Sequence, residues 1–387
     1  MRNKPQVRAR RLIDEKPWVR IKRVDSRSNV KIVDLFAGIG GFHYGIAAAA
    51  SKINKGVKPL LVSELDPECR NVYERNHDCV VQGDINEISL RGIKEQADIV
   101  TAGFPCQPFS NSGLKLGLSD PRGQFYFKIV EIIKKYDAKS FILENVSGIR
   151  TNGGGKYASE LATTPQKIGN SMHVLEQNLK KLTDYHIQWL EIDSSKFGSP
   201  QVRKRVYIVG VKKKYTKQLD LKFNDYKPKC FIDVVEEEFI DALKLSENQE
   251  SNIRKFMEKK PPSFHDGMRR VGQAYTCSGG NVGQGYHAYG MVPTLTKVWA
   301  RFLPIYFPDQ ETENIDEIIS PDYKPNGNYG DGHIRRASVR EVMRLQGFPD
   351  TFVPHHKDSV AYQHAGNAVN AKIVREIADC IFGYIKK

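Results

Sequence analysis

Cysteine is scarce in this sequence, and long apolar runs are missing. The 387 residues include six cysteines without a CxxC pair, which argues against a disulfide framework or a zinc ribbon and predicts a protein of the reducing cytoplasm. No apolar run approaches the ~18 residues that a membrane-spanning helix needs. The basic N-terminus lacks the apolar core of a secretory signal. The composition excludes a disordered or fibrous chain, and the length predicts two or three soluble domains.

Basic residues outnumber acidic ones, and the excess is concentrated in two segments. The formal net charge is +14. Residues 1–28 hold ten basic and three acidic residues, and residues 196–229 hold eleven and two, so the remainder of the chain is slightly acidic. Localised positive charge favours a polyanion through counterion release. A solubilising surface would show the same excess and stays open as the alternative.

Apolar runs alternate with helix-like segments in the first half of the chain. Strands are expected at 30–37, 60–65, 79–85, 98–104, 140–146, 185–192 and 205–211. Helices are expected at 42–53, 67–76, 124–136, 338–345 and 370–385. This order predicts an α/β fold with parallel βαβ units, whose ligands bind at the carboxyl ends of the strands. The long Gly, Pro and Ser-rich loop 105–123 is of a kind that is usually functional.

The segment 212–335 lacks this periodicity. Glycine and aromatic residues cluster in Ala274–Tyr289, and the strand and helix patterns fade. We therefore expect a second, irregular domain here, followed by a return to the first domain.

The first expected strand ends in a glycine-rich segment, Asp34–Gly41, that is expected to turn. Position 43 is His where a dinucleotide fingerprint has its third glycine, which weakens an NAD interpretation. Glu64 and Asp84 end the next two expected strands, where carboxylates can bind ribose hydroxyls and an adenine amino group. S-adenosylmethionine fits these features, with Phe36 facing its sulfonium cation. A purely structural turn is the alternative.

Cys106 opens the long loop, in Gly103–Ser110, at the end of the fourth expected strand. A thiol there faces the cofactor pocket and becomes a good nucleophile near positive charge or a helix N-terminus. A buried, inert residue is the usual role of a lone cysteine, and we expect it for the other five.

Three charged residues accompany this cysteine. Glu144 follows an apolar run, so we expect partial desolvation and a raised pKa; a helix cap or a surface acid is the alternative. Arg203 and Arg205 precede the last expected strand, where alternate residues share a face. Two guanidinium groups there can hold a carboxylate, a base carbonyl or a phosphate, or they can form a solvated basic edge.

Together these motifs resemble the DNA (cytosine-5)-methyltransferases of bacterial restriction–modification systems, over about residues 30–387. The matching segments, in family order, are Asp34–Gly41, Gly103–Ser110, Glu144–Val146, Gln201–Arg205, Arg340–Pro349 and Gly366–Val369. The resemblance implies a Rossmann-like, mostly parallel seven-stranded sheet with a smaller target-recognition domain. It also implies that the last motif folds back beside the first.

The resemblance assigns roles to individual residues. Cys106 would add to carbon 6 of cytosine, Glu144 would bind the ring nitrogen and exocyclic amine, and Arg205 would contact the base carbonyl. Arg203 would orient the catalytic residues, and Pro105 would shape the pocket. The cofactor S-adenosylmethionine, converted to S-adenosylhomocysteine without a metal, would contact Phe36, Ala37, Gly38, Gly40, Glu64, Leu65, Asp84, Ile85, Phe104, Asn367 and Ala368.

The implied partner is double-stranded DNA, contacted by Gln107, Ser110, Arg122 and Thr294, with the 105–123 loop closing on a flipped base. The expected domains are a basic arm at 1–28, a catalytic domain at 29–212, a target-recognition domain at 213–335 and a return to the catalytic domain at 336–387. The family also implies a cytoplasmic, nucleoid-associated monomer paired with a restriction endonuclease, with no membrane association.

Two departures and three alternatives stay open. Leu65 stands where many family members stack an aromatic residue on adenine, and the arm at 1–28 is either a disordered tail or a phosphate clamp. An RNA cytosine-5 methyltransferase on the same fold is the first alternative function. A catalytically inactive DNA-binding protein and an NAD oxidoreductase are the others.

Overall fold

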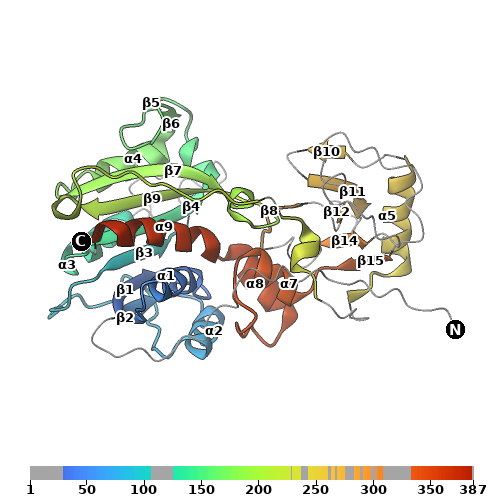
Figure 1. Ribbon diagram of the computed structural model, residues 1–387, viewed down its shortest axis with the longest axis horizontal. Coiled ribbons are helices and arrows are strands. Elements are labelled where there is room, and N and C mark those ends of the chain that lie inside the picture. Colours follow the sequence, from blue (N-terminus) through green and yellow to red (C-terminus); the bar gives the residue numbers. More distant parts are fainter. Residues whose placement is uncertain are drawn as a thin grey trace. The chain divides into compact units, whose positions relative to one another are not determined.

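The structure is a computed structural model, shown in Figure 1. It describes residues 29–105, 125–227, 229–236, 243–259, 263–265, 268–274, 283–287, 291–297, 300, 303–307 and 333–385. Four residues with predicted roles lie outside these ranges, as does the arm at 1–28: Cys106, Gln107, Ser110 and Arg122.

The chain divides into two compact units. The sheet unit comprises the described residues of 29–193, 204–225 and 368–385, and the second unit those of 194–203 and 226–367. These bounds differ from the expected domain boundaries. Residues 336–367 group with the second unit and 213–225 with the sheet unit, because contacts rather than sequence periodicity decide where a chain segment packs. For example, the Tyr384 hydroxyl accepts a hydrogen bond from the backbone N–H of Asp220 at 3.0 Å.

A six-stranded sheet forms the centre of the sheet unit within the described residues, in the order β2-β1-β3-β4-β9-β7. Its strands are β1 (Val30–Leu35), β2 (Val57–Ser63), β3 (Ile99–Gly103), β4 (Ser140–Val146), β7 (Tyr185–Asp193) and β9 (Lys204–Lys212). The first four are parallel, whereas β9 is antiparallel to both β4 and β7. The expected α/β class is confirmed, and β9 is the strand of this described sheet that runs against the others.

The prediction of a strand at 79–85 is wrong in its extent. Its absence explains why the described sheet has six strands where seven were expected. Only one bridge forms, between Ser63 and Gln82. The backbone N–H of Val81 donates instead to the Glu74 carboxylate at 2.8 Å, so it is not available to a ladder. The apolar run reflects burial of single residues rather than a continuous strand, and Val80 is 81% exposed.

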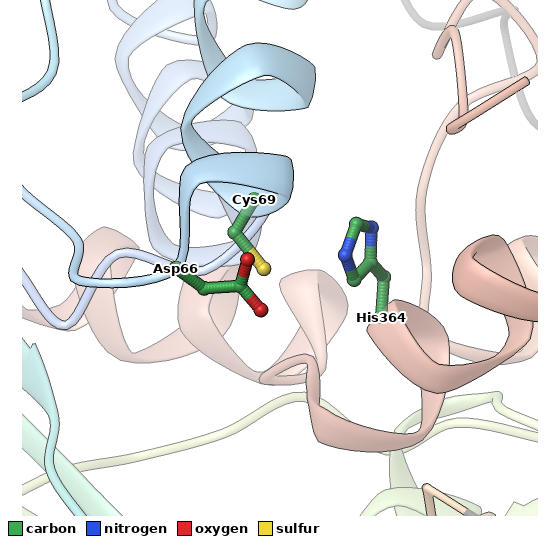
Figure 2. Close-up of side chains that lie close together, drawn as sticks. All are labelled: Asp66, Cys69 and His364. Atoms are coloured by element: carbon green, nitrogen blue, oxygen red, sulfur yellow. The ribbon is translucent and has the colours of Figure 1, made fainter.

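Helices cover the sheet at the expected places, except for the one at Asn170–Leu179, which the sequence analysis did not predict. They are α1 (Gly41–Ser51), α2 (Pro67–Asn76), α3 (Phe125–Lys135), α4 (Asn170–Leu179) and α9 (Ala371–Ile385). Helix α2 begins as predicted at a proline in its first turn, and the Asp66 carboxylate caps it by accepting the N–H of Glu68 at 2.9 Å. Figure 2 shows Asp66 and Cys69 at this end of α2; His364, also labelled, belongs to a helix of the second unit. Within the described residues, no helix combines the length and apolar character that crossing a bilayer requires.

Helix α9 packs against α1, which brings the end of the chain to the first motif. A Cβ atom on Gly45 of α1 would lie 2.7 Å from the carbonyl oxygen of Ala371, and one on Gly41 would lie 2.6 Å from that of Val369. Glycine is needed at both positions because the two backbones are this close. The expected return of the last motif to the first is confirmed at Val369.

The second unit contains a sheet where the sequence predicted irregular structure. Its order is β10-β11-β12-β14-β15, with β10 (Ser263–His265), β11 (Met268–Ala274), β12 (Gly283–His287), β14 (Pro304–Phe307) and β15 (His333–Arg336). The helices are α5 (Glu247–Lys259), α7 (Val339–Leu345) and α8 (Asp358–Asn367). A short two-stranded sheet pairs β8 (Gln201–Val202) with β13 (Val292–Pro293) in this unit, and another pairs β5 (Tyr157–Ala158) with β6 (Lys167–Ile168) in the sheet unit. Short and interrupted strands leave little period-two signal, which explains the missed sheet.

The Phe141 ring of β4 lies directly over Gly210 of β9. A Cβ atom on Gly210 would lie 2.1 Å from a ring carbon of Phe141, its cross-strand partner, which is fully buried. We expect Gly210→Ala to lower the free energy of unfolding by about 2 kcal/mol or more, because overpacking forces the aromatic ring or the strand to move.

Urea denaturation of the two proteins measures this loss. Gly383→Ala is the control: a Cβ atom there meets nothing within 4 Å, so it should leave stability unchanged or raise it through helix propensity. Equal stabilities of wild type and Gly210→Ala would contradict the argument.

Candidate active site

The glycine-rich turn between β1 and α1 is built from left-handed backbone. Phe36, Gly38 and Gly40 have φ values of 53°, 54° and 92°. The backbone N–H of Gly38 donates to Oε2 of Glu64 at 2.8 Å, which ties the turn to the end of β2. A Cβ atom on Gly38 would meet no atom within 4 Å, so the backbone faces open space here. A ligand can therefore approach the main chain closely at this turn.

Glu64 and Leu65 form the adjacent edge of this site. Each oxygen of the Glu64 carboxylate accepts one backbone N–H, from Gly38 and from Asp66 at 2.9 Å. Each oxygen retains a second lone pair, which can accept from a ligand hydroxyl. The Leu65 side chain is 69% exposed and offers an apolar contact beside it.

Arg70 braces this edge and was missed by the sequence analysis. Its guanidinium donates to the carbonyl oxygens of Glu64 and Leu65, each at 3.0 Å. The available signal was a basic residue in the first part of a helix, where acidic residues are favoured. The arginine fixes the backbone that carries both predicted ligand-binding side chains.

Asp84 and Ile85 follow the bridge at Gln82. The Asp84 Oδ1 atom accepts from both nitrogens of Asn86, at 2.8 and 2.9 Å, which makes a tight turn. Ile85 is buried in the core. The hydroxyl of Ser63 donates to the carbonyl of Gly83 at 2.8 Å and holds this turn next to β2. The two predicted cofactor residues therefore lie next to the strand end that carries Glu64.

The ends of β3 and β4 bring the turn and Glu144 together. Gly103 is paired with Glu144 in the parallel ladder. A Cβ atom on Gly103 would lie 3.8 Å from the Glu144 carboxylate and 3.8 Å from the carbonyl oxygen of Phe36. The chain leaves this point through buried Phe104 and exposed Pro105, directly before Cys106.

Glu144 is paired with Arg205 across β4 and β9. The Nε atom of Arg205 lies 3.2 Å from Oε1 of Glu144, and both side chains are 13% exposed. The sequence argument placed Glu144 in a partly desolvated position but did not include this cation. The pair can present a carboxylate and a guanidinium to one planar ligand.

Asn145 is a second residue that the sequence analysis left without a role. Its side chain is buried, and its Nδ2 atom donates to the carbonyl oxygen of Phe104 at 2.8 Å. The Phe104 ring packs edge-on against Tyr126. Asn145 thus anchors the backbone two residues before Cys106, and its position in the Glu-Asn-Val motif was the available signal.

Arg203 does not share a face with Arg205, contrary to expectation. It lies between β8 and β9 rather than within one strand, so the alternation rule does not apply across it. Its guanidinium is buried and donates to the carbonyl oxygens of Leu295 at 2.9 Å and Gly366 at 3.3 Å. Arg203 therefore ties together three segments of the second unit.

The carbonyl oxygens that accept from Arg203 belong to Leu295 and Gly366. Thr294 directly precedes the first of these residues, and Asn367 and Ala368 follow the second. The Thr294 hydroxyl donates to the carbonyl oxygen of Val202 at 2.8 Å. A Cβ atom on Gly366 would lie 2.4 Å from the backbone of Thr296, so glycine is required at this position. Asn367 ends α8 and is exposed, whereas Ala368 is buried. DNA contact by Thr294 and cofactor contact by the other two stay predictions.

Comparison with known proteins decides the family. A family model for C-5 cytosine-specific DNA methylases matches residues 30–383. This chain belongs to that family. The expected enzyme class, a DNA (cytosine-5)-methyltransferase of the S-adenosylmethionine-dependent α/β type, is confirmed.

Individual relatives of this DNA methylase agree with the assignment. The Type II methyltransferase M.HaeII of Haemophilus aegyptius is 32% identical over 354 residues, which cover 90% of this chain and 91% of that protein. M.DsaV of Dactylococcopsis salina, another Type II methyltransferase, is 30% identical over 368 residues, covering 93% and 88%. The solved structure of the Entamoeba histolytica methyltransferase EhMeth has a TM-score of 0.64 at 16% identity and covers 93% of this chain and 100% of that chain. That likeness concerns the fold.

Proposed function

We propose that this methylase modifies a cytosine within a specific sequence of duplex DNA, through a covalent adduct of Cys106 with a base turned out of the helix. The modification would protect host DNA from a partner endonuclease, as the names of the Type II relatives suggest. The observation that carries the proposal is the Glu144–Arg205 pair, because Glu144 on β4 is the ladder partner of Gly103, at the end of the strand that leads to Cys106.

A nucleophile is needed because carbon 5 of cytosine is too electron-poor to attack a methyl donor. The Cys106 thiolate adds to carbon 6, a sulfur–carbon bond forms, and the electron pair moves to carbon 5 and the ring. Carbon 5 would then take the methyl group that the bound donor supplies and release its proton to water, and the electron pair left behind would re-form the ring double bond as the carbon 6–sulfur bond breaks and the thiolate leaves. The net change is replacement of hydrogen by methyl.

Glu144 and Arg205 suit recognition of the ring during this addition. A Glu144 carboxyl that shares a proton with ring nitrogen 3 stabilises the charge that develops there, and its second oxygen can accept from the exocyclic amine. Arg205 donates to the base carbonyl, and its position 3.2 Å from Glu144 keeps both groups on one edge. Asn145 holds the Phe104 carbonyl and so positions the segment that carries the thiol.

The turn site fits S-adenosylmethionine. Open space at Gly38, lone pairs on Glu64 and the exposed side chain of Leu65 match a ligand with an amino-acid portion, ribose hydroxyls and an adenine ring. When bound, the cofactor supplies an electrophilic methyl group on a sulfonium. Asp84 and Phe36 would complete the site, at the adenine amine and the cation respectively.

The target carbon is stacked inside duplex DNA, so the base must be extruded. Unstacking and unpairing cost a few kcal/mol, which contacts to the flipped base must offset. The Glu144–Arg205 pair offers hydrogen-bonding groups to the edge of cytosine that was paired with guanine in the duplex.

We expect Glu64→Gln to weaken S-adenosylmethionine binding by roughly tenfold or more. The amide oxygen can still accept one backbone N–H, but the amide nitrogen then faces the other as a second donor, and the charge-assisted bond to the ribose is lost. Isothermal titration calorimetry measures the affinity. Glu68→Gln is the matched control, because Glu68 lies exposed in α2 and should leave affinity unchanged.

Methyl transfer to defined nucleic acids tests the function. The full-length protein is incubated with labelled S-adenosylmethionine and either duplex DNA or tRNA, and the DNA is then bisulfite-sequenced. We expect label in duplex DNA at one short recurring sequence, and resistance of that DNA to an endonuclease that cuts it. Label in tRNA with none in DNA would overturn the proposal in favour of the RNA enzyme.

A further inference from the structure

A buried chain of polar side chains begins at Asp34, directly before the cofactor turn. The Asp34 side chain is fully buried. Its Oδ1 atom accepts the Thr101 hydroxyl of β3 at 2.7 Å, and its Oδ2 atom accepts the Tyr73 hydroxyl of α2 at 3.2 Å. Nothing in the proposed reaction uses this carboxyl group.

The chain continues from Tyr73 to the underside of the turn. The Nδ1 atom of His43 lies 2.9 Å from the Tyr73 hydroxyl. The His43 ring stacks on His77 with centroids 3.7 Å apart. The Nε2 atom of His77 would lie 2.7 Å from a Cβ atom on Gly40, so this ring supports the turn from below. His43, which stands where a dinucleotide fingerprint has glycine, is thus held by Tyr73 through a hydrogen bond and by His77 through ring stacking.

The neighbours of Asp34 leave its charge uncompensated. The pKa of Asp34 is raised to about 7: burial is the main cause and nearby Glu64 adds to it, whereas the bonds from Thr101 and Tyr73 act in the opposite direction. Burial lowers the pKa of His43 to about 3. His43 is therefore neutral near pH 7, and Asp34 changes its charge there.

The other titratable groups of this network stay uncharged near pH 7. Burial holds the pKa of His77 well below its ordinary value, and that of Tyr73 well above. Burial also raises the pKa of Tyr44 to about 12 and that of Cys79 to about 11. Asp34 is thus the group of this buried network that titrates near neutrality, and Glu64 is the acid beside it.

We propose that Asp34 is a specificity-determining residue that makes the methylase prefer the cationic methyl donor to its neutral thioether product. This inference rests on the proposed cofactor site at the Phe36–Gly40 turn. A buried carboxylate in a weakly polarisable environment acts over several ångströms, so a cation bound at the turn stabilises its charged form. S-adenosylhomocysteine has the same amino-acid and nucleoside groups but lacks the sulfonium charge.

The hydrogen bonds between Asp34, Tyr73 and His43 can form whether Asp34 is ionised or protonated. When Asp34 is ionised, Thr101 and Tyr73 both donate to it, and an Nδ1–H of His43 can donate to the Tyr73 oxygen. When Asp34 holds a proton, it can donate to the Tyr73 oxygen, and the Tyr73 hydroxyl can turn to Nδ1 of His43 in its other tautomer.

The direction of the pH effect follows from linkage. A bound sulfonium lowers the pKa of Asp34, so binding releases a proton and becomes tighter as pH rises through neutrality. A decrease of one pKa unit makes the donor bind roughly fivefold more tightly at about pH 7.5 than at about pH 5.5. The product should change by less than about twofold over the same range, in which the ligands' own amino group stays mostly protonated.

Equilibrium titration of the full-length protein with S-adenosylmethionine and with S-adenosylhomocysteine across this range tests the proposal. Asp34→Asn should remove the difference between the two pH profiles, because an asparagine can make the bonds of the protonated carboxyl. Asp379→Asn is the matched control. Asp379 is a partly buried carboxyl on α9 whose pKa burial also raises, and this variant should keep the wild-type profile.

Thr101→Val supplies a second variant if Asp34→Asn folds poorly. Loss of a donor to the charged carboxylate should move the midpoint of the donor profile to higher pH. Parallel profiles for donor and product in the wild type, or an unchanged midpoint in Thr101→Val, would overturn the proposal while leaving the cofactor site intact. Failure of both ligands to bind at any pH would overturn the cofactor site itself.

Discussion

Replacement of Cys106 with alanine is expected to abolish methylation while DNA binding persists. In the proposed reaction the thiolate supplies the bond to carbon 6 that makes carbon 5 nucleophilic, and no neighbouring side chain offers a comparable nucleophile among the described residues of this site. Removal of a covalent nucleophile typically costs on the order of 10⁴-fold or more in turnover. DNA affinity depends mainly on phosphate contacts, which the substitution leaves in place.

Single-turnover methyl transfer and gel-shift titration separate the two effects. Cys380→Ala is the matched control, because burial raises the pKa of the Cys380 thiol to about 11 and keeps it unreactive. A duplex with 5-fluorocytosine at the target gives a positive readout, since the fluorine cannot leave as a proton does and the adduct accumulates. We expect a denaturation-resistant complex with the wild type and Cys380→Ala, but not with Cys106→Ala. Measurable methylation by Cys106→Ala would refute the role of this thiol.

Glu144→Gln is expected to lower kcat by roughly 10²- to 10³-fold with little change in cofactor affinity. The glutamine still occupies the space, but it cannot share a proton with ring nitrogen 3 as the adduct forms. Arg205→Met should also lower kcat. The double variant should lose less than the product of the two single losses, because both groups act on the same ring.

Steady-state kinetics of the four proteins give this cycle, and melting temperatures show whether each variant is folded. Glu191→Gln is the matched control: it breaks the ion pair of Glu191 with Arg150, 3.3 Å long, on another strand of the same sheet. We expect its kcat to equal that of the wild type. Full activity of Glu144→Gln, or losses that simply multiply in the double variant, would contradict the shared role.

The structure gives Arg203 different partners from those of Arg205. On a shared face, the two guanidinium groups could have held one ligand or formed a solvated edge, and the resemblance implied that Arg203 orients the catalytic residues. The break between β8 and β9 instead directs Arg203 to the carbonyl oxygens of Leu295 and Gly366, whereas Arg205 pairs with Glu144. We infer that Arg203 positions segments of the second unit rather than the reacting base.

Local sequence patterns predicted most of the sheet and the position of the motifs at strand ends, and the resemblance of those motifs to a known family indicated the enzyme class. The Asp34–Gly41 turn, Glu64 and Glu144 each follow an apolar run, and the carboxyl ends of parallel strands meet at one edge of a sheet. Their residue types at that edge left several ligands open, and the resemblance to a known family selected among them. The structure confirms the places where these runs end, except at 79–85.

Only the tertiary structure decided the rest, because those features depend on contacts between residues far apart in the chain. The Arg205 pair with Glu144, the Asn145 bond to Phe104 and the unit that receives residues 336–367 follow from such packing. The charge of Asp34 is the sharpest example. From the sequence, Asp34 is expected to have the pKa of an ordinary aspartate. Its pKa lies near neutrality only because α1, α2 and β3 exclude water around it.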